Sequence, residues 1–165
     1  MQNNYHIIFY RVLQYAIILI ALTLRASGQY ETEINFFATK YDLPPLLIRA
    51  VIRVESNFNP KARNPLPPSR KGVSSNGLMQ VNGGSFDVRD NINTGCSILR
   101  KCFDAYDGNL LNALTAYNAG IHGAKKYIKR KDYHYAHLVL SWYWKYLWQE
   151  IIKNSQLTIK NGSEK

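Results

Sequence analysis

The sequence of 165 residues contains only two cysteines, Cys96 and Cys102. Two cysteines are too few for a disulfide-stapled scaffold or for a zinc site with four thiolates. The six prolines and ten glycines exclude a collagen-like or low-complexity chain. With 46% hydrophobic and 19% charged residues, the composition is that of a globular protein that folds without such staples.

Acidic residues are also scarce: there are 11 against 21 lysines and arginines, which gives a formal net charge of +10. A basic protein suits an anionic partner such as nucleic acid, anionic lipid or an anionic cell-wall polymer. The sequence has no nucleic-acid-binding motif, so we expect no nucleic-acid partner. The histidines lack metal-ligand spacing, and we predict no metal and no cofactor. They are His6, His122, His134 and His137.

The apolar stretch near the N-terminus is short for a membrane span. Residues 12–24 provide 13 positions, whereas a transmembrane helix needs about 20. The stretch follows Arg11 and precedes Ala26-Ser27-Gly28, which is typical of a secretory signal with cleavage after Gly28. We therefore expect residues 1–28 to be a signal peptide that directs export. The alternative is an uncleaved anchor that would associate the protein with a membrane.

Hydrophobic periodicity along the rest of the chain predicts helices and almost no strands. The expected helices cover residues 31–41, 46–56, 91–106, 109–119 and 135–152, with a basic segment at 124–131. Residues 57–76 are rich in Pro, Asn and Ser and predict a surface loop. We expect one all-α domain of five to seven helices at residues 29–153, followed by a polar, frayed tail at 154–165.

One carboxylate lies on the apolar face of a predicted helix. Residues 46–56 have apolar side chains at helical spacing: Leu47, Ile48, Val51 and Ile52. Glu55 continues this apolar stripe. Burial raises the pKa of a carboxyl group, and the negative end of the helix dipole adds to the effect. Glu55 is therefore a candidate general acid. The alternatives are an ion pair with Arg49 or Arg53, or exposure at a helix end.

Four short motifs, of which the first contains Glu55, occur in a specific order along the chain. They are Glu55-Ser56, Gly77-Leu78-Met79-Gln80, Asn91-Ile92 with Gly95, and Ala116-Tyr117-Asn118-Ala119-Gly120. Together they resemble the catalytic domain of soluble lytic transglycosylases, over about residues 34–140. The resemblance implies a lysozyme-like fold and peptidoglycan as substrate. Members of this family cleave the β-1,4 bond between N-acetylmuramic acid and N-acetylglucosamine.

The mechanism implied by the resemblance uses a single acid and adds no water. Glu55 would protonate the glycosidic oxygen, and its carboxylate would then take the proton of the C6 hydroxyl. The C6 oxygen would close on C1 and leave a 1,6-anhydro sugar. A hydrolase of the common kind needs two carboxylates, and the chain has no Asp or Glu between Glu55 and Asp87. We interpret Asp87 and Asp90 as loop or cap residues.

The resemblance also implies which residues contact the sugar. Ser56 would contact the muramic acid region, although a helix cap is its alternative. Gln80 would bind sugar, and Met79 would pack either in the cleft or in the core. Tyr117 and Asn118 would form the floor of the cleft, with an aromatic face stacked on a sugar ring. Core packing is the alternative for Tyr117.

A tyrosine late in the family's domain hydrogen-bonds the catalytic Glu. Tyr135 is the best match, and Tyr133 is the alternative because residues 131–134 depart from the usual Glu-Thr pair. The segment 81–90 is shorter than in many relatives, so the cleft wall that it builds is expected to differ.

Three further features have structural as well as functional interpretations. Cys96 and Cys102 are six residues apart, about 9 Å along a helix, which is too far for a disulfide. We expect core thiols, which could be oxidised only if the helix broke. The basic segment 125–131 is either a solvated face or a site for an acidic partner. The final helix carries aromatics on several faces, so some are exposed or covered by a partner.

The size of the chain resembles that of transglycosylases that accompany secretion systems, pili or conjugation machines. That resemblance implies a periplasmic enzyme that opens the wall locally, with a component of such machinery as partner. One alternative is a goose-type muramidase that hydrolyses the same bond. Another is an inactive wall-binding assembly protein, against which the intact Glu55, Gln80 and Tyr117 argue.

Overall fold

The computed structural model describes residues 28, 30–65 and 72–162, with side chains up to Leu157. The expected signal peptide, apart from Gly28, lies outside the described residues. The chain divides into two compact units, Met1–Thr32 and Glu33–Lys165. The description below concerns the second unit. The helix Glu31–Tyr41 begins two residues before the boundary between the units. Among the described residues, no helix combines the length and the apolar character needed to cross a membrane.

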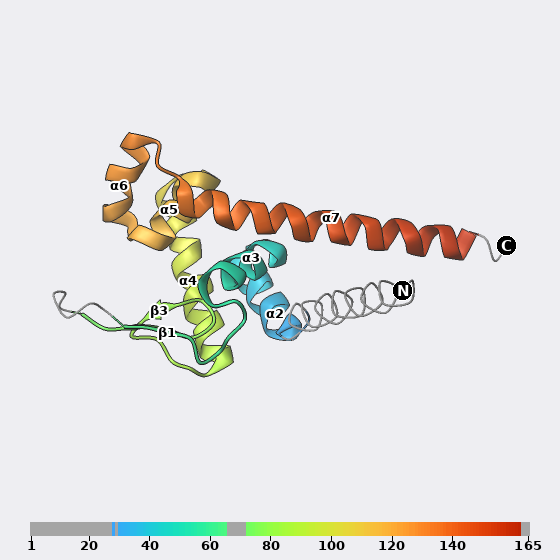
Figure 1. Cartoon of the computed structure of the whole chain (residues 1–165), viewed down its shortest axis with the longest axis horizontal. Coiled ribbons are helices and arrows are strands. Elements are labelled where there is room, and N and C mark those ends of the chain that lie inside the picture. Colours follow the sequence, from blue (N-terminus) through green and yellow to red (C-terminus); the bar gives the residue numbers. More distant parts are fainter. Residues whose placement is uncertain (1–27, 29, 66–71, 163–165) are drawn as a thin grey trace, which may run out of the picture. The chain divides into compact units, whose positions relative to one another are not determined.

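Six helices and three short strands make up the described chain (Figure 1). The helices are α2 (Glu31–Tyr41), α3 (Pro45–Ser56), α4 (Val88–Ala105), α5 (Leu110–Ala119), α6 (Ile121–Arg130) and α7 (His134–Gly162). The strands are β1 (Arg63–Asn64), β2 (Ser75–Asn76) and β3 (Val81–Asn82). This architecture confirms the predicted all-α domain of five to seven helices.

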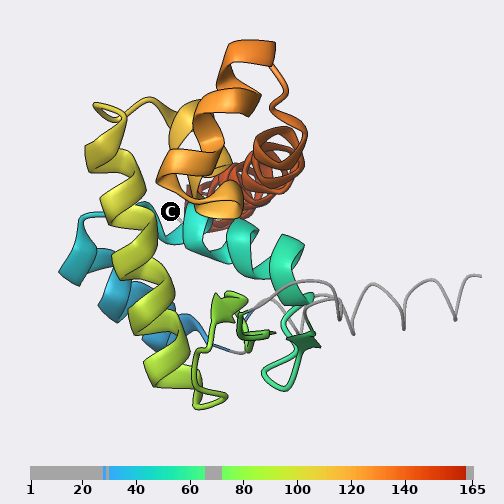
Figure 2. The same ribbon diagram turned by 90° about the vertical axis from the view of Figure 1, so that its left-hand side faces the viewer.

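Helix α3 is the central helix of the fold. Its residues 47–52 are all buried, with Arg49 as the one charged residue among them, so the middle of the helix is enclosed on nearly every face. Figure 2 shows α3 crossing the middle of the fold, with α4 on one side and α5 and α6 above. Helix α7 packs along α3, and α5 packs against α4, α6 and α7. The C-terminal end of α3 is therefore surrounded by elements that can build a site around it.

Polar caps explain where α4 and α5 begin. The Asp87 carboxylate accepts a hydrogen bond of 2.9 Å from the backbone N–H of Asp90, so α4 starts at Val88 and not at the predicted residue 91. Asn109 caps α5 in the same way, through the N–H of Asn112 at 3.0 Å. Gly120 separates α5 from α6 with φ 75° and ψ 151°, a conformation that is essentially restricted to glycine.

A small antiparallel sheet covers one side of the domain. Its strand order is β1-β2-β3, with Arg63 opposite Asn76 and Ser75 opposite Asn82. Each strand has only two residues, so no alternating pattern exists for the sequence to reveal. The side chains of Leu78 and Met79 in the turn before β3, and of Val81 in β3, are buried. This apolar turn fastens the sheet to the helical core.

Helix α7 is longer than the sequence predicted. The expected frayed tail beyond Asn154 is helical up to Gly162. Residues 153–161 contain no proline or glycine, so nothing in the segment breaks the helical hydrogen bonds before Gly162. The polar composition that suggested a tail instead gives an exposed continuation of the helix, in which residues 153–157 are all exposed.

The aromatic residues of α7 fall into two groups. Arg53 of α3 lies over the ring of Trp142 at 4.3 Å, and Tyr146 is buried. Trp144 and Trp148, in contrast, are 54% and 63% exposed. The expectation that the final helix displays aromatics on more than one face is therefore confirmed.

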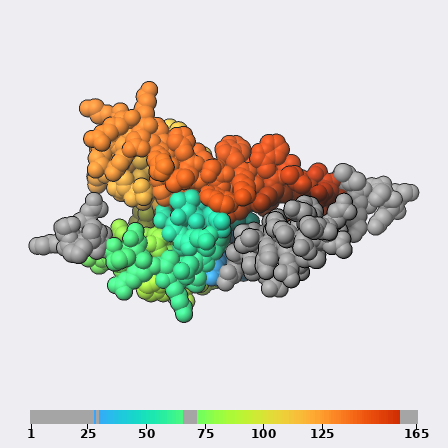
Figure 3. Space-filling view, in the orientation of Figure 1, coloured from blue at the N-terminus to red at the C-terminus, as the bar shows by residue number. Residues whose placement is uncertain are grey.

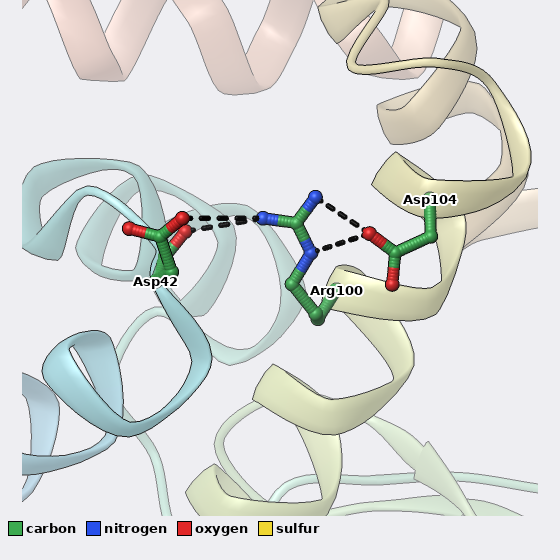
Figure 4. A network of polar contacts seen from close by, with 3 residues as sticks. All are labelled: Asp42, Arg100 and Asp104. Carbon is green, nitrogen blue, oxygen red and sulfur yellow. Dashed lines mark hydrogen bonds and ion pairs between the residues drawn. The ribbon is translucent and has the colours of Figure 1, made fainter.

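An exposed polar network joins α4 to the connection between α2 and α3 (Figure 4). The Arg100 guanidinium lies 2.7 Å from the carboxylate of Asp104 and 3.9 Å from that of Asp42. It also donates to the backbone carbonyl of Asp42 at 3.3 Å. Because these groups are exposed, the network orients Arg100 more than it stabilises the fold.

The two cysteines are buried, free thiols on α4. Burial raises the pKa of Cys96 to about 12 and that of Cys102 to about 11. The helix does not break between them, so the thiols stay too far apart for a disulfide. The prediction of core thiols is confirmed.

Candidate active site

A cleft of about 1320 Å³ opens between the β1–β3 sheet and the α5–α6 region. In Figure 3 the green surface of the sheet region faces the yellow and orange surface of α5 and α6. Its walls come from the end of α3, from β1–β3, from α4 and α5, and from the starts of α6 and α7. Segments that are far apart in sequence therefore contribute to one concave surface, as ligand sites commonly require.

Glu55 lies in this cleft, in the last turn of α3. The helix ends at Asn57, whose left-handed conformation (φ 53°) lets its N–H bond the Arg53 carbonyl at 3.2 Å. The Tyr135 hydroxyl donates a hydrogen bond of 2.6 Å to Oε1 of Glu55. Within the described residues, Glu55 makes no ion pair with Arg49 or Arg53. Of the two candidate tyrosines, Tyr135 is the one bonded to Glu55.

The surroundings of Glu55 favour its protonated form. Burial raises the pKa of Glu55 from 4.5 to about 7, although the hydrogen bond from Tyr135 acts in the opposite direction. Burial also raises the pKa of Tyr135 and of Tyr117 well above the ordinary value, and the nearby Glu55 charge adds to this effect. Both tyrosines are therefore neutral hydroxyl donors. Glu55 can exchange a proton near neutral pH, as a general acid and base must.

Two side chains fix the cleft floor and its wall. The Tyr117 hydroxyl donates to the backbone carbonyl of Met79 at 2.8 Å, which joins α5 to the turn before β3. The Gln80 amide nitrogen donates to the carbonyls of Ala62 at 3.1 Å and Gly77 at 2.9 Å. Gln80 has φ 49°, an uncommon backbone conformation that this closed turn maintains. Both side chains line the cleft and also hold it in shape.

Asn91 organises the wall from behind. This side chain is 1% exposed, and its Oδ1 accepts a hydrogen bond of 2.8 Å from the N–H of Met79. Its Nδ2 donates to the carbonyls of Asn76 at 2.9 Å and Ser85 at 2.8 Å. One buried amide thus satisfies three backbone groups of the segment 76–85. The motif order includes Asn91, but the sequence alone does not indicate this role in the wall.

The structure brings most of the predicted site residues together. Glu55, Ser56, Gln80, Tyr117, Asn118 and Tyr135 all line the cleft. The Ser56 hydroxyl donates to the Ile52 carbonyl at 3.2 Å, within its own helix. Met79 does not line the cleft: its side chain is fully buried. Core packing, the alternative interpretation, therefore holds for Met79.

Several cleft residues were not predicted from the sequence. Among them are three basic side chains: Arg63 on β1, Lys101 on α4 and His122 at the start of α6. Arg63 falls in the segment 57–76, which the sequence predicts to be a surface loop. The sequence signal for Lys101 is its position on α4, three residues after Ile98 and next to Cys102, which both line the cleft.

Among the residues that the structure describes, Glu55 is the one carboxylate that lines the cleft. Asp87 and Asp90 lie at the start of α4, where they form the cap described above. No group of three or more His, Cys, Asp or Glu side chains in the described chain could hold a metal ion. The acid–base chemistry of a carboxyl group in the cleft therefore falls to Glu55.

The sequence matches the Transglycosylase SLT domain over residues 33–86 and 83–138. These matches include Glu55 and every other predicted site residue. The chain belongs to this family.

This SLT domain is similar to a curated protein named transglycosylase from Enterobacteria phage PRD1. The two are 31% identical over an alignment of 114 residues, and the match covers 64% of this chain and 40% of the phage protein. The chain therefore spans well under half of that relative's length.

Two solved structures have a similar fold. One is an inactive mutant of lytic transglycosylase Slt from Pseudomonas aeruginosa, with a TM-score of 0.58 and 22% identity, covering 70% of this chain and 23% of that chain. The other is the 70-kDa soluble lytic transglycosylase from Escherichia coli, with a TM-score of 0.61 and 22% identity, covering 73% and 24%. They confirm the expected lysozyme-like lytic transglycosylase fold.

Proposed function

We propose that this SLT domain is a lytic transglycosylase that cleaves the β-1,4 bond between N-acetylmuramic acid and N-acetylglucosamine. One observation carries the proposal. Glu55 is a partly buried carboxyl group with a pKa of about 7 in a cleft whose described lining contains no second carboxylate. A hydrolase of the common type would need a second carboxylate about 5–10 Å away. A lone acid suits an intramolecular reaction in which the substrate supplies the nucleophile.

In the first step, Glu55 acts as general acid. The hydrogen bond from Tyr135 holds Oε1, and we assign Oε2 to the glycosidic oxygen. Glu55 transfers its proton to this oxygen as the bond from C1 to the oxygen breaks. N-acetylglucosamine leaves with a free 4-hydroxyl group. Positive charge develops at C1 of the muramic acid, where the sugar's own N-acetyl oxygen assists and the Glu55 carboxylate stabilises it.

In the second step, Glu55 acts as general base. Its carboxylate accepts the proton of the C6 hydroxyl group while the C6 oxygen forms a bond to C1. The product is a 1,6-anhydro-N-acetylmuramic acid end, and Glu55 is protonated again. No water enters the balance. The raised pKa serves both steps, because a group with a pKa near the working pH gives and takes protons with similar ease.

The remaining polar groups of the cleft orient the sugars. We assign the face of Tyr117 to stacking on a sugar ring, and the Asn118 amide to an acetamido group. Gln80 and Ser56 present polar groups to the same strand, with Ser56 near the muramic acid. Met79 contributes through its backbone carbonyl, which positions the Tyr117 hydroxyl.

Mass spectrometry of the soluble products tests the reaction. Peptidoglycan digested with the protein should give anhydro-muropeptides, each lighter by one water molecule than the hydrolysed product, and Glu55→Gln should give none. Hydrolysed ends would show a goose-type muramidase instead. Retained wall binding with no cleavage by either form would show a wall-binding protein.

We also propose that residues 1–28 export the protein to the periplasm, where it opens the wall locally for a secretion, pilus or conjugation machine. The short apolar stretch and the small residues before Gly28 support export. N-terminal sequencing of the periplasmic protein should begin at Gln29. Glu55→Gln should abolish assembly of the machine; normal assembly with this variant would refute the role.

A further inference from the structure

The exposed side of α6 is strongly basic. From Ile121 to Lys131 the chain contains no Asp or Glu, and Asp132 is the first acid that follows. Five exposed cations lie in this segment, and none of them forms an ion pair with an acid that the structure describes. They are Lys125, Lys126, Lys129, Arg130 and Lys131. These five residues, the basic face of α6, therefore carry charge that no described acid neutralises.

The packing of α6 directs this charge outward. Ala124 is buried, and Ile121 and Ile128 pack against the core cluster to which it belongs. At 3.6 residues per turn, Lys126 and Lys129 then lie on the opposite side of the helix. The helix dipole favours cations in the last turn, where Lys129 but not Lys126 lies. Stabilisation of the helix therefore does not explain the whole basic face.

The following helix, α7, has an apolar stripe that faces solvent. The side chains of the stripe are between 48% and 63% exposed. At 3.6 residues per turn they occupy about a third of the helix circumference. Tyr146, which is buried and contacts Arg49 of α3, points to the opposite side. The stripe therefore points away from α3, and it consists of Trp144, Trp148, Ile151 and Ile152.

The basic face and the stripe belong to adjoining helices. Residues 131–133 connect α6 to α7, and both helices lie on the side of the second unit opposite to the sheet (Figures 1 and 2). Peripheral proteins bind anionic bilayers through cations, which attract the headgroups, together with aromatic and aliphatic side chains, which enter the boundary with the acyl chains. Trp suits this boundary because its ring is largely apolar and carries one polar N–H. The two features together therefore fit an anionic lipid surface.

A second copy of the chain suits the stripe less well. A coiled coil needs apolar side chains at alternating spacings of three and four residues over several heptads. Trp144, Trp148 and Ile151 follow this spacing, but the next positions in the two directions are Ser141 and Ser155. Two copies of a chain with a net charge of +10 also repel each other, whereas an anionic bilayer attracts the chain. Charge complementarity therefore favours the lipid surface.

We propose that α6 and α7 dock the protein on the surface of an anionic phospholipid bilayer. The basic face of α6 lies against the lipid phosphates, and the stripe of α7 enters the headgroup region. Docking concentrates the protein at the membrane and uses none of the residues assigned to the reaction. It therefore goes beyond the proposed function, and its test needs no cleavage.

Tryptophan fluorescence can report on this docking. The chain has three tryptophans, and all of them lie on α7: Trp142, Trp144 and Trp148. The exported protein is mixed with vesicles of phosphatidylglycerol and phosphatidylcholine whose acyl chains carry bromine, which quenches nearby tryptophans. Residues 1–28 contain no tryptophan, so attachment of the chain through them does not by itself produce the signal.

Anionic vesicles should quench the fluorescence at low salt. The quenching should weaken as the sodium chloride concentration rises, because salt screens the attraction. Vesicles of brominated phosphatidylcholine alone should need at least about tenfold more lipid for half-maximal quenching. No quenching by anionic vesicles, or equal quenching by the two kinds of vesicle, would overturn the proposal.

Charge variants test the basic face. Lys126→Gln/Lys129→Gln should need about 25-fold more anionic lipid for half-maximal quenching, because each cation near an anionic surface contributes about fivefold, or about 1 kcal/mol. Lys61→Gln/Arg89→Gln is the matched control, since it removes two exposed cations outside α6 and α7. The control should stay within about twofold of the wild type. An equal loss in the control would overturn the docking site, because net charge alone would then explain binding.

Ile151→Gln and Leu157→Gln test the stripe. The two side chains are 48% and 50% exposed on the same helix, but Leu157 lies about half a turn away from the middle of the stripe. Ile151→Gln should need about fivefold more anionic lipid, because an amide replaces apolar area that enters the bilayer, whereas Leu157→Gln should match the wild type. Both variants keep all three tryptophans. Equal effects of the two substitutions would overturn the role of the stripe.

Sedimentation velocity without lipid distinguishes a membrane from a second copy. We expect a monomer. A dimer that Ile151→Gln returns to the monomer, together with no quenching by vesicles, would overturn the proposal in favour of pairing between copies. Circular dichroism checks that each variant keeps its helices, and the salt dependence of the wild type tests the charge without any substitution.

Discussion

The hydroxyl of Tyr135 and the carboxylate of Glu55, 80 residues apart in sequence, meet at 2.6 Å. Glu55 comes from the last turn of the central helix α3, and Tyr135 from the first turn of α7. The hydrogen bond therefore depends on the packing of α7 along α3. Because the bond stabilises the carboxylate while burial destabilises it, the pKa of about 7 is a balance between these two effects.

Replacing Tyr135 by Phe should change that balance in a known direction. Loss of the donor removes the effect that lowers the pKa of Glu55, so the pKa rises above about 7. If protonated Glu55 is the general acid, wild-type kcat/KM falls as the pH rises through about 7, and in Tyr135→Phe this limb should move up by about one pH unit. The measurement is the pH profile of kcat/KM.

Tyr133→Phe serves as the control for this profile. Tyr133 does not line the cleft, and its ring contacts His137 edge-on. The alkaline limb of the kcat/KM profile of Tyr133→Phe should coincide with that of the wild type. A Tyr135→Phe profile that also coincides would show that the hydrogen bond does not tune the acid.

Replacing Glu55 by Gln should make stability less dependent on pH. The folded state raises the pKa of Glu55 from 4.5 to about 7, so it binds the proton more tightly than the unfolded chain. Stability contributed by the protonated group is present below 4.5 and is lost as the pH rises to about 7. Because the neutral Gln cannot ionise, its stability relative to wild type should improve by about 1–3 kcal/mol between about pH 5 and pH 8.

Urea unfolding of both proteins at several pH values measures this difference. The comparison within each protein across pH removes any constant cost of the substitution itself. Parallel stability curves for wild type and Glu55→Gln would show that Glu55 is not desolvated in the folded state.

Local patterns predicted the position of the acid and most of the helices. The apolar phase of α3 made Glu55 a candidate, because a carboxylate on a buried face is costly unless it is paired or protonated. The order of the motifs that follow it was needed to prefer the catalytic interpretation over an ion pair or an exposed position. The Asn109 and Gly120 boundaries of α5 also follow from local chemistry, since a cap needs only a few adjacent residues.

Features that depend on distant contacts could not be predicted in this way. Whether Met79 faces the cleft or the core is decided by α4, where a glycine at position 95 leaves room for the methionine side chain. The cleft position of Lys101 depends on how α4 meets α6. Strands of two residues have no periodicity, and the polar end of α7 has the composition of both a tail and an exposed helix.

Asn91→Ala should destabilise the cleft wall strongly. The substitution leaves the Met79 N–H and the carbonyls of Asn76 and Ser85 without their partner. Unsatisfied buried groups cost about 1–3 kcal/mol each before relaxation, so we expect a net loss of about 2–4 kcal/mol. Chemical unfolding measures this loss. Asn93→Ala, at a half-buried position of the same helix, should cost under about 1 kcal/mol. Equal losses would show that Asn91 is not the organiser of the wall.

Gly95→Ala and Gly123→Ala should change stability in opposite directions, although both positions are helical. A Cβ at Gly95 would lie 2.6 Å from the Cβ of Met79 and still closer to its sulfur, whereas a Cβ at Gly123 would meet only Ala119 at 3.8 Å. Overpacking in the core should cost Gly95→Ala about 1–3 kcal/mol. Gly123→Ala should gain up to about 1 kcal/mol from higher helix propensity. Thermal unfolding of the two variants measures both effects. A Gly95→Ala protein as stable as Gly123→Ala would mean that the Met79 side chain moves aside, and that the turn before β3 does not depend on this close approach to α4.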